Sequence, residues 1–430
     1  MEGMPLGIYI SVPFCRTKCS YCNFASDVFS RSIFERYVER LAADMARAAE
    51  TAIRMGGRFE RAVDSVYLGG GTPSLLEPGQ LERILEGVRG NFEVRPDAEI
   101  TAECAPGTLK PEIIEALVRC GVDRISLGVQ SFVDEEARAV ARLHTRQIVL
   151  DDIERLRNAG ISNINIDLIA GLPHQTSKSW DVSLNEAIAT GVPHVSVYML
   201  EIDEDSRLGR ELIAGGTKYH AHFVPDEDLT ADLYTRACER LDDAGVRQYE
   251  ISNFARPGFP SKHNLKYWTR QPYMGFGVDA HSMLEAETDP YVSLRAHEIA
   301  GGAGGSRPCA VTAADLESVR FSTSDSLEQY LKVAALQRIP VSLYQAREEA
   351  FFLGLRLNEG VDLEKLALRL GLPAEMRAVI SELLAEALLT KAGTRIALTP
   401  RGRLLCNEVF ARFIAPSETV SHHGGAETRS

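Results

Sequence analysis

The sequence predicts an α/β fold in which a mainly parallel sheet is covered by helices. Short runs rich in β-branched residues alternate with longer amphipathic segments, which is the pattern of strand–loop–helix units. Several of the short runs are apolar on both faces, as strands buried in a parallel sheet are. Six such units indicate a barrel, although periodicity does not decide whether it closes. With 430 residues, 45% of them hydrophobic, the chain can bury a large core in two domains or in one large domain with an appendage.

The units can be placed in order along the chain. The predicted strands are Ile8–Val12, Ser65–Leu68, Glu99–Glu103, Arg124–Val129, Asn163–Ile169 and His194–Leu200. The predicted helices are Ile33–Arg54, Pro78–Arg89, Pro111–Arg119, Ile148–Ala159, Ser177–Ala189 and Thr230–Ala244. Asp and Ser before these helices and Gly after them fit helix caps. In a parallel barrel the loops after the strands carry the functional residues, so the site is expected there.

Charge and hydropathy argue against several classes of function. The net charge of −13 opposes non-specific nucleic-acid binding, which needs a basic surface. No run approaches the roughly 18 uninterrupted apolar residues of a spanning helix, so at most peripheral membrane contact is expected. No apolar signal segment follows Met1, and free thiols persist in a reducing compartment, so the expected location is the cytoplasm.

Three cysteines, Cys15, Cys19 and Cys22, crowd the loop after the first predicted strand. Thiolates are soft ligands that suit zinc or iron–sulfur clusters, and a closed site would want a fourth ligand nearby. The next cysteine is Cys104, so one metal position is left open for an exogenous ligand. A zinc knuckle or three buried structural cysteines are the alternatives. A disulfide scaffold does not suit a chain with 8 cysteines in 430 residues.

Polar residues accompany the next four predicted strands. After the second comes Gly69-Gly70-Gly71-Thr72-Pro73, whose glycines let backbone amides approach a polar ligand, with an ordinary tight turn as the alternative. Glu103 stands at the third strand, Gln130 at the fourth and Asp167 at the fifth, each amid apolar neighbours. Buried polar groups need partners, so either a ligand or an internal hydrogen-bond network satisfies them. Their shared location favours the ligand.

The spacing Cys-x3-Cys-x2-Cys resembles the signature of the radical S-adenosylmethionine (SAM) superfamily. The resemblance implies that Cys15, Cys19 and Cys22 hold a [4Fe–4S] cluster by three irons, and that the fourth iron chelates the amino and carboxylate groups of SAM. It also implies a partial (β/α)6 TIM-like barrel, open on one side for a large substrate. A cofactor of this kind carries the radical chemistry while the protein orients it and excludes water.

Further runs narrow the resemblance to the HemN/HemW group of this superfamily, over nearly the whole chain. These runs are Tyr9-Ile10-Ser11-Val12-Pro13-Phe14-Cys15, Gly-Gly-Gly-Thr-Pro, Gly-Val-Gln-Ser-Phe, Ile-Asp-Leu-Ile-x-Gly-Leu-Pro and Tyr249-Glu250-Ile251-Ser252-Asn253-Phe254. The tyrosine six residues before the first cysteine lies against SAM in this group, which implies that role for Tyr9. The other SAM contacts implied by the resemblance are Gly70, Gly71, Thr72, Glu103, Gln130, Arg142 and Asp167. For Arg142 the role rests on the resemblance alone.

The group contains oxygen-independent coproporphyrinogen III dehydrogenases and haem chaperones, and three features favour the chaperones. The dehydrogenases carry an additional cysteine two positions after the third ligand, where this chain has Phe24. They have a long N-terminal segment that reaches into the substrate site, whereas only Met1–Gly7 precede the first strand here. The run His263-Asn264-Leu265-Lys266-Tyr267-Trp268 also matches the chaperones' His-Asn-x-x-Tyr-Trp signature.

The resemblance therefore implies a protein that binds haem and transfers it to haem-requiring acceptor proteins, with respiratory proteins among the candidates. The alternatives are a coproporphyrinogen III dehydrogenase and a haem-degrading radical SAM enzyme.

His263 is the expected haem ligand. Imidazole is a common axial ligand of haem iron, and Tyr267 and Trp268 offer flat apolar surface against which a porphyrin can pack. Lys262 and Lys266 flank the histidine and are suited to propionate carboxylates. The alternative is a capped loop histidine with two aromatics in the core.

Four segments are expected. Residues 1–260 form the barrel domain, and residues 261–325 hold the haem signature followed by a flexible insertion with the glycine-rich run Gly301–Ser306. Residues 326–415 form a mainly α, winged-helix-like domain. Its expected elements are amphipathic segments at Ser326–Ile339, Leu343–Leu355, Leu363–Leu370 and Met376–Ala387, a hairpin over Leu389–Leu398 and a last helix over Thr399–Arg412. Residues 416–430 are expected to be a disordered tail. Winged helices often bind DNA, but the acidic balance favours packing or partner docking here.

Overall fold

The computed structural model describes residues 3–287, 316–333 and 335–414 of the chain. It divides into two compact units, Met1–Ala346 and Arg347–Ser430. The first unit therefore extends past the predicted domain boundary at residue 326. Each unit is described by itself below.

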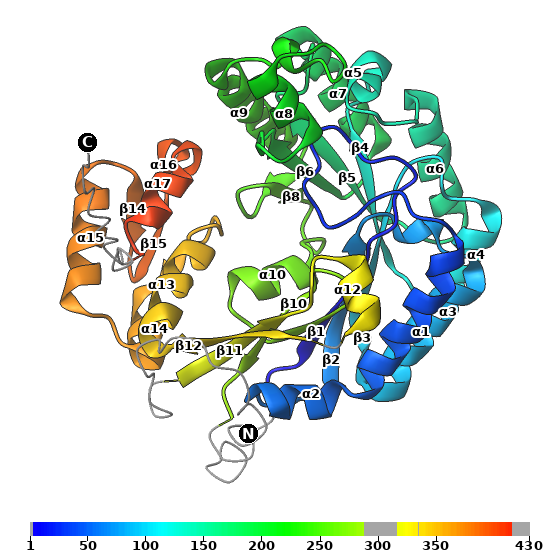
Figure 1. Ribbon diagram of the computed structural model, residues 1–430. Helices are drawn as coiled ribbons and strands as arrows, with labels where there is room; N and C mark the ends of the chain where they lie inside the picture. Colours follow the sequence, from blue (N-terminus) through cyan, green and yellow to red (C-terminus); the bar gives the residue numbers. More distant parts are fainter. Residues whose placement is uncertain (1–2, 288–315, 334, 415–430) are drawn as a thin grey trace, which may run out of the picture. The chain divides into compact units, whose positions relative to one another are not determined.

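Six parallel strands form the centre of the first unit (Figure 1). They are β1 (Leu6–Val12), β2 (Ala62–Gly70), β3 (Glu93–Cys104), β4 (Arg124–Gln130), β5 (Asn163–Ala170) and β6 (His194–Met199). Each pairs in parallel with the next in chain order, from β1 to β6. The two outermost strands of the whole sheet do not pair with each other, so the barrel is open. The predicted partial (β/α)6 barrel is confirmed.

Helices follow the strands and cover the outer face of the sheet (Figure 1). They are α1 (Ser32–Ala46), α2 (Ala48–Met55), α3 (Pro78–Asn91), α4 (Pro111–Arg119), α5 (Asp134–Ala139), α6 (Arg146–Asn158), α7 (Ser177–Thr190), α8 (Arg207–Ala214) and α9 (Glu227–Asp243). The predicted helix Ile33–Arg54 is wrong in one respect, because it is two helices that separate at Arg47. No glycine or proline marks this break, and α5 and α8 are too short to give a clear periodic signal.

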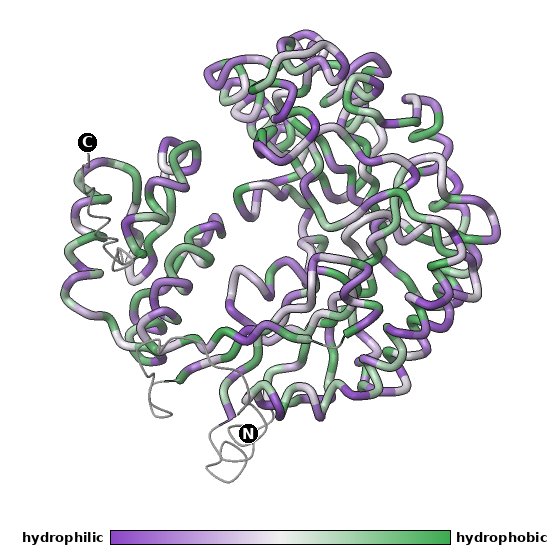
Figure 2. Tube along the Cα trace, viewed as in Figure 1, coloured by the Kyte–Doolittle hydropathy of each residue, from purple (hydrophilic) through white to green (hydrophobic). Residues whose placement is uncertain are grey.

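The core lies between the outer face of the strands and these helices. In β1 the side chains of Leu6, Ile8, Ile10 and Val12 are fully buried and belong to the large hydrophobic cluster. Figure 2 shows hydrophobic strands inside and mixed hydropathy along the helices. Because side chains alternate along a strand, Tyr9 of β1 points to the opposite face, the barrel lumen. Each buried Leu or Ile contributes about 1.5–3 kcal/mol, so the outer face stabilises the barrel while the lumen is left for polar residues.

The sheet continues beyond the six-stranded barrel on both sides. Next to β1 lies β9 (Tyr273–Phe276), paired in parallel, followed by the antiparallel strands β10 (His281–Glu285), β11 (Leu316–Ser322) and β12 (Gln337–Ser342). At the other end β8 (Asn253–Ala255) and β7 (Arg247–Gln248) follow β6. The helix α10 (Lys262–Trp268) carries the predicted haem signature.

Two expectations for this region need correction. The part of residues 261–325 expected to be an insertion after the haem signature also contains β10 and β11, which extend the sheet. The predicted helix Ser326–Ile339 is helical only in α12 (Leu327–Lys332) and then enters β12. The run Gly301–Ser306 lies outside the described residues.

The helix α13 (Leu343–Gly354) begins shortly before the boundary of the second unit and continues into it. The second unit also contains a small sheet of three short strands. The strand order is β13 (Val361–Asp362), β15 (Arg395–Leu398), β14 (Leu389–Ala392), all antiparallel, which confirms the predicted hairpin. The other helices are α14 (Leu363–Leu370), α15 (Ala374–Ala385), α16 (Pro400–Leu404) and α17 (Cys406–Ala411). The last two replace the single helix predicted over Thr399–Arg412. Residues 416–430 lie outside the described residues.

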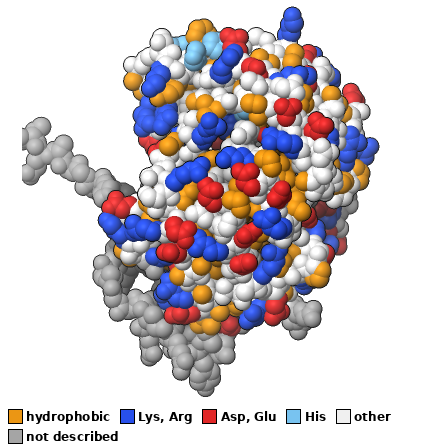
Figure 3. Space-filling view, turned by 90° about the vertical axis from the view of Figure 1, so that its right-hand side faces the viewer, with side chains coloured by type: hydrophobic (Ala, Val, Ile, Leu, Met, Phe, Trp, Pro, Cys, Tyr) orange, Lys and Arg blue, Asp and Glu red, His pale blue; other side chains and the backbone are white. Residues whose placement is uncertain are grey.

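The surface agrees with the composition. On the face in Figure 3, basic and acidic side chains are interspersed, and no continuous basic field is present on that face. Among the described residues, no helix is both long enough and apolar enough to cross a bilayer.

Candidate functional site

The cysteine loop follows β1 and is fixed by backbone contacts to distant segments. Cys15 N donates to Asp27 O at 2.9 Å, and Asp27 N donates to Pro13 O at 3.0 Å. Further along, Leu208 N donates to Ser20 O at 2.8 Å. The loop is thus held by protein contacts alone, which preorganises its thiols.

The three thiols are free and close enough to influence one another. Cys19 is buried, while Cys15 and Cys22 are half-buried. Burial raises the pKa of Cys15, and the neighbouring thiols Cys22 and Cys19 raise it further. Burial likewise raises the pKa of Cys22, with Cys19 adding to the effect. Within the described ranges no three His, Cys, Asp or Glu side chains are arranged around a single metal ion.

This donor set fits an iron–sulfur cluster better than zinc. A single zinc ion needs each sulfur at about 2.3 Å, which draws the ligands together. A cluster spreads its ligands over several irons and binds thiolates almost exclusively. Thiols that interact electrostatically without converging on one point suit the second arrangement.

Arg142 lies against this loop. Its Nη1 donates to Cys19 Sγ at 3.5 Å, and its Nη2 donates to the carbonyl of Gly128. Burial lowers the pKa of Arg142, but Cys19 and Tyr21 more than offset this, and the net pKa is raised. The arginine thus joins the cysteine loop to β4. Gln130 ends β4 with φ of 69°, and an added Cβ on Gly128 would lie 3.2 Å from its Nε2.

The glycine run after β2 is joined to the cysteine loop through its backbone. Gly71 N donates to Val12 O at 2.8 Å, and Thr72 N donates to Phe14 O at 2.7 Å. A Cβ on Gly71 would lie 2.7 Å from both of those carbonyl oxygens. Only a glycine therefore permits this approach. The sequence predicted that Gly71 lets the backbone approach a ligand. In the structure its close contacts are with Val12 and Phe14 of the chain itself.

Two carboxylates face the lumen from β3 and β5. Glu103 accepts from Tyr67 Oη at 2.8 Å and from Gly70 N at 3.2 Å. Burial, followed by the charge of Asp167, raises the pKa of Glu103 to about 7. Asp167 accepts from Ser126 Oγ at 3.1 Å, and burial raises its pKa as well. Ionisation of Glu103 near neutral pH is therefore finely balanced.

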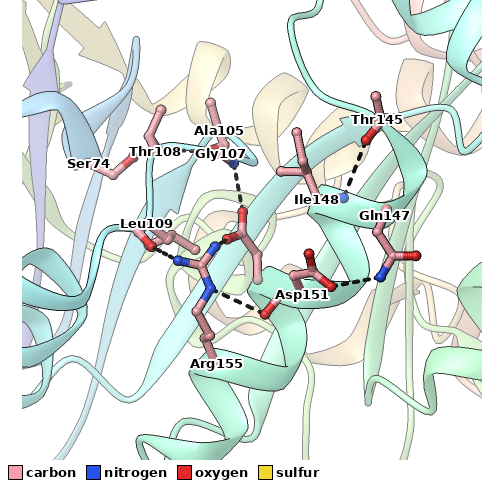
Figure 4. Close-up of polar contacts among 11 residues, drawn as sticks. Ser74, Ala105, Gly107, Thr108, Leu109, Thr145, Gln147, Ile148, Asp151 and Arg155 are labelled. Carbon is pink, nitrogen blue, oxygen red and sulfur yellow. Dashed lines mark hydrogen bonds and ion pairs between the residues drawn. The ribbon is translucent and has the colours of Figure 1, made fainter.

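The loop that leaves β3 after Glu103 is tied to α6 (Figure 4). Gly107 N donates to Asp152 Oδ2 at 2.7 Å, and Arg155 Nη1 donates to Leu109 O at 2.7 Å. The Thr108 hydroxyl lies 2.6 Å from that of Ser74 in the loop after β2. These contacts fix the position of the loop next to the glycine run.

A pocket brings several predicted residues together. Its walls are Tyr9, Ser11, Phe24, Ala25, Gly70, Glu103, Val278 and Asp279, and its volume is about 110 Å³. Tyr9, Gly70 and Glu103 were predicted. Asp279, which follows β9, was missed because β9 reaches the site only by pairing with β1. Phe24 is 64% exposed, an unusual state for an aromatic side chain.

His263 lies deeper in the lumen, between β1 and β2. Its Nδ1 is 3.0 Å from Ser65 Oγ, and its Nε2 is 2.9 Å from Tyr267 Oη. The Tyr67 and Tyr9 rings stack near it, with centroids 5.3 and 6.3 Å from that of His263. Both ring nitrogens are thus occupied within the protein. A ligand to iron would have to replace one of these contacts.

The charges around His263 keep it neutral. Burial lowers its pKa to about 3, and the cations Lys266 and Arg124 add to the effect. Lys266 is itself buried and pairs with Asp64 at 2.7 Å. Lys262 Nζ donates to Asp97 O at 2.7 Å. The two lysines expected to meet propionates therefore have partners inside the protein.

Comparisons with known proteins place this arrangement in a family. Residues 9–187 match the radical SAM superfamily, and residues 341–405 match the HemN C-terminal domain. The chain is 32% identical to heme chaperone HemW of Lactococcus lactis over 96% of its own length and 98% of that relative. The chain belongs to the HemW family. It is also 31% identical to heme chaperone HemW of Bacillus subtilis, over 94% of this chain and 98% of that one.

The fold has a solved counterpart. The coproporphyrinogen III oxidase HemN of Escherichia coli, a radical SAM enzyme, superposes with a TM-score of 0.76 over 96% of this chain and 90% of that one. At 23% identity this likeness concerns the fold. HemW sequences align with nearly the whole chain, so the match takes in both units and the β9–β12 extension.

Proposed function

We propose that this chain is a haem chaperone that binds a [4Fe–4S] cluster, SAM and haem and passes haem to haem-requiring acceptor proteins. The observation that carries the proposal is the near-full-length similarity to proteins named heme chaperone HemW. The solved HemN structure supports the scaffold only, because its identity to this chain is 23%. The reducing cytoplasm is the proposed location, since open thiolate-ligated clusters require it.

Cys15, Cys19 and Cys22 are the proposed cluster ligands, held in place by the backbone contacts of their loop. When bound, the cluster and SAM supply radical chemistry that side chains alone cannot. Arg142 Nη1 contacts the Cys19 sulfur from one side. Gly71 and Thr72 fix the other side of the loop through Val12 and Phe14.

Tyr9, Gly70, Glu103, Gln130 and Asp167 are the proposed SAM contacts. Three of them line or border the pocket beside the cysteine loop, with Glu103 at its wall. The ionised carboxylates accept hydrogen bonds from the amino or ribose groups of a ligand, and the Tyr9 ring supplies a flat surface. The sulfonium cation of SAM is also favoured by the nearby carboxylates of Glu103 and Asp167.

Glu103→Ala is expected to weaken SAM binding about tenfold, because losing a hydrogen bond to a charged group costs roughly 1.5–3 kcal/mol. Calorimetric titration of the anaerobically reconstituted protein measures it, and iron content should stay normal. Glu115→Ala, on the exposed side of α4, is the matched control. Unchanged SAM affinity in Glu103→Ala would mean that this carboxylate has only a structural role.

His263 is the proposed haem ligand, and its neutral ring is the form that binds metal. Haem ligation would require one ring nitrogen of His263 to give up its present partner, Ser65 Oγ or Tyr267 Oη. The purified protein should then show a defined Soret band, and His263→Ala should shift this band or weaken haem binding about tenfold or more. His281→Ala, whose side chain is 65% exposed, is the control. A spectrum indifferent to His263→Ala would discard this ligand and leave the family assignment intact.

Transfer separates the chaperone from an enzyme. Haem-loaded protein mixed with a haem-free globin should lose its Soret signature as the globin gains its own. The same anaerobic preparation, given SAM and coproporphyrinogen III, should form no product. Steady SAM-dependent formation of protoporphyrinogen would overturn the proposal.

A further inference from the structure

Arg124 begins β4 and points into the barrel lumen with only 2% of its surface exposed. Its register neighbours are Thr101 of β3 and Asn163 of β5. Among the described residues its Nε has no hydrogen-bond partner, and no carboxylate oxygen lies within 4.0 Å of its guanidinium. An unpaired buried charge is costly, so a compensating charge at longer range is needed.

The compensating charges lie one layer further along the lumen. Ser126 follows Arg124 on the same face of β4, roughly 6.6 Å along the strand. Ser126 is the register neighbour of Glu103, and it donates to Asp167 at 3.1 Å. The two carboxylates therefore lie just above the arginine. Two like charges facing each other need a cation nearby if both are to stay ionised.

We propose that Arg124 is a positioning residue that keeps Glu103 and Asp167 ionised for SAM from beneath the binding pocket, without touching the ligand. The inference rests on the proposed assignment of these carboxylates to SAM. Arg124 is then a buried cation that acts through its charge and not through an ion pair.

The ionisation of the surrounding groups agrees with this role. Arg124 lowers the pKa of both Glu103 and Asp167, opposing the larger effect of burial. It lowers the pKa of His263 too, which leaves that ring neutral. Its charge thus acts on both sides of the lumen.

Titratable groups face Glu103 from every element around it. They are Tyr9 of β1, Tyr67 of β2, Cys104 of β3, Arg124 of β4, Asp167 of β5, Tyr198 of β6, Tyr267 of α10 and Asp279, which follows β9 and lines the same pocket. Burial raises the pKa of each of these tyrosines and of Cys104, so they are neutral near pH 7. Arg124 is the cation of the set, and Asp167 and Asp279 are its other carboxyl groups. Removing Arg124 should therefore raise the pKa of Glu103, and SAM binding should need a higher pH.

The test is the pH profile of SAM binding between pH 6 and 8.5, measured by calorimetry on reconstituted protein. Arg124→Met should move the midpoint of the profile upward by about one pH unit, which weakens binding roughly fivefold at pH 7 and about tenfold at pH 6. Affinity should approach that of the native protein at the alkaline end. Arg124→Lys, which keeps the charge, should stay within about threefold of native.

Arg124→Gln carries the same expectation and replaces the methionine variant if that one does not fold. A loss of SAM affinity that is equal at every pH would mean that Arg124 has a structural role, and it would overturn the inference. A loss that Arg124→Lys does not restore would have the same meaning. Glu103→Gln separates this from the SAM assignment itself. If Glu103→Gln binds SAM like the native protein, the assignment fails; if it binds weakly while the Arg124 variants keep the native midpoint, the charge-compensation inference alone fails.

Discussion

Cys19→Ser will reduce the iron content of the reconstituted protein from about four atoms per chain to near zero. Cys19 is the buried member of the three thiols and receives the hydrogen bond of Arg142 at 3.5 Å. A serine hydroxyl stays protonated and is a poor ligand for iron in a cluster, so two thiolates would remain. Colorimetric iron analysis and the broad visible absorbance after anaerobic reconstitution give the result.

The matched control is Cys238→Ser on α9, which should keep its full iron content. Cys104 and Cys120 are also buried, and burial raises the pKa of Cys104 to about 12. Such a thiol is a poor source of a replacement thiolate. Native iron content in Cys19→Ser would show that the three-cysteine assignment is wrong.

Gly71→Ala should destabilise the protein by roughly 2–4 kcal/mol and release the cysteine loop. Its methyl group would sit 2.7 Å from the carbonyl oxygens of Val12 and Phe14, and both atoms belong to the backbone. Relief of the clash must lengthen the hydrogen bonds from Gly71 N and Thr72 N that join the two loops. Urea unfolding of the cluster-free protein measures the stability, and iron retention measures the state of the loop.

Gly79→Ala on α3 is the control, because nothing lies within 4 Å of its added Cβ. Alanine in a helix is better than glycine by about 0.5–1 kcal/mol, so this variant should be neutral or slightly more stable. Equal stability of the two alanine variants would contradict the close approach at Gly71.

The barrel could be predicted because each of its strands carries its own apolar signal. The extension could not, since β9 has four residues and finds its place only by pairing with β1, far earlier in the chain. The first helix ends at Arg47 without a glycine or proline, so the periodicity of apolar residues predicted one continuous helix. Local pattern reports on local structure, and these features depend on distant partners.

The same distinction applies to the site. The cysteines are one local motif, and Glu103 and Asp167 are polar residues in apolar strands. The sequence pattern could therefore identify all of them. Ser65, the partner of His263 Nδ1, comes from β2 and was therefore not visible in the sequence of α10. In the sequence Arg124 is only the charged first residue of a predicted strand. The fold alone shows that it is buried without an ion pair.

The anchoring of the cysteine loop also orders events during synthesis. The loop is made before the segments that hold it, with sequence separations of 123 for Arg142 to Cys19 and 189 for Arg207 to Lys18. At about 5–20 residues per second, this delay is on the order of ten to forty seconds. The three thiols therefore lack these contacts on the nascent chain until Arg142 and Arg207 have been made. Iron delivered during that interval would meet a loop without its final shape, so cluster insertion belongs after translation of the barrel.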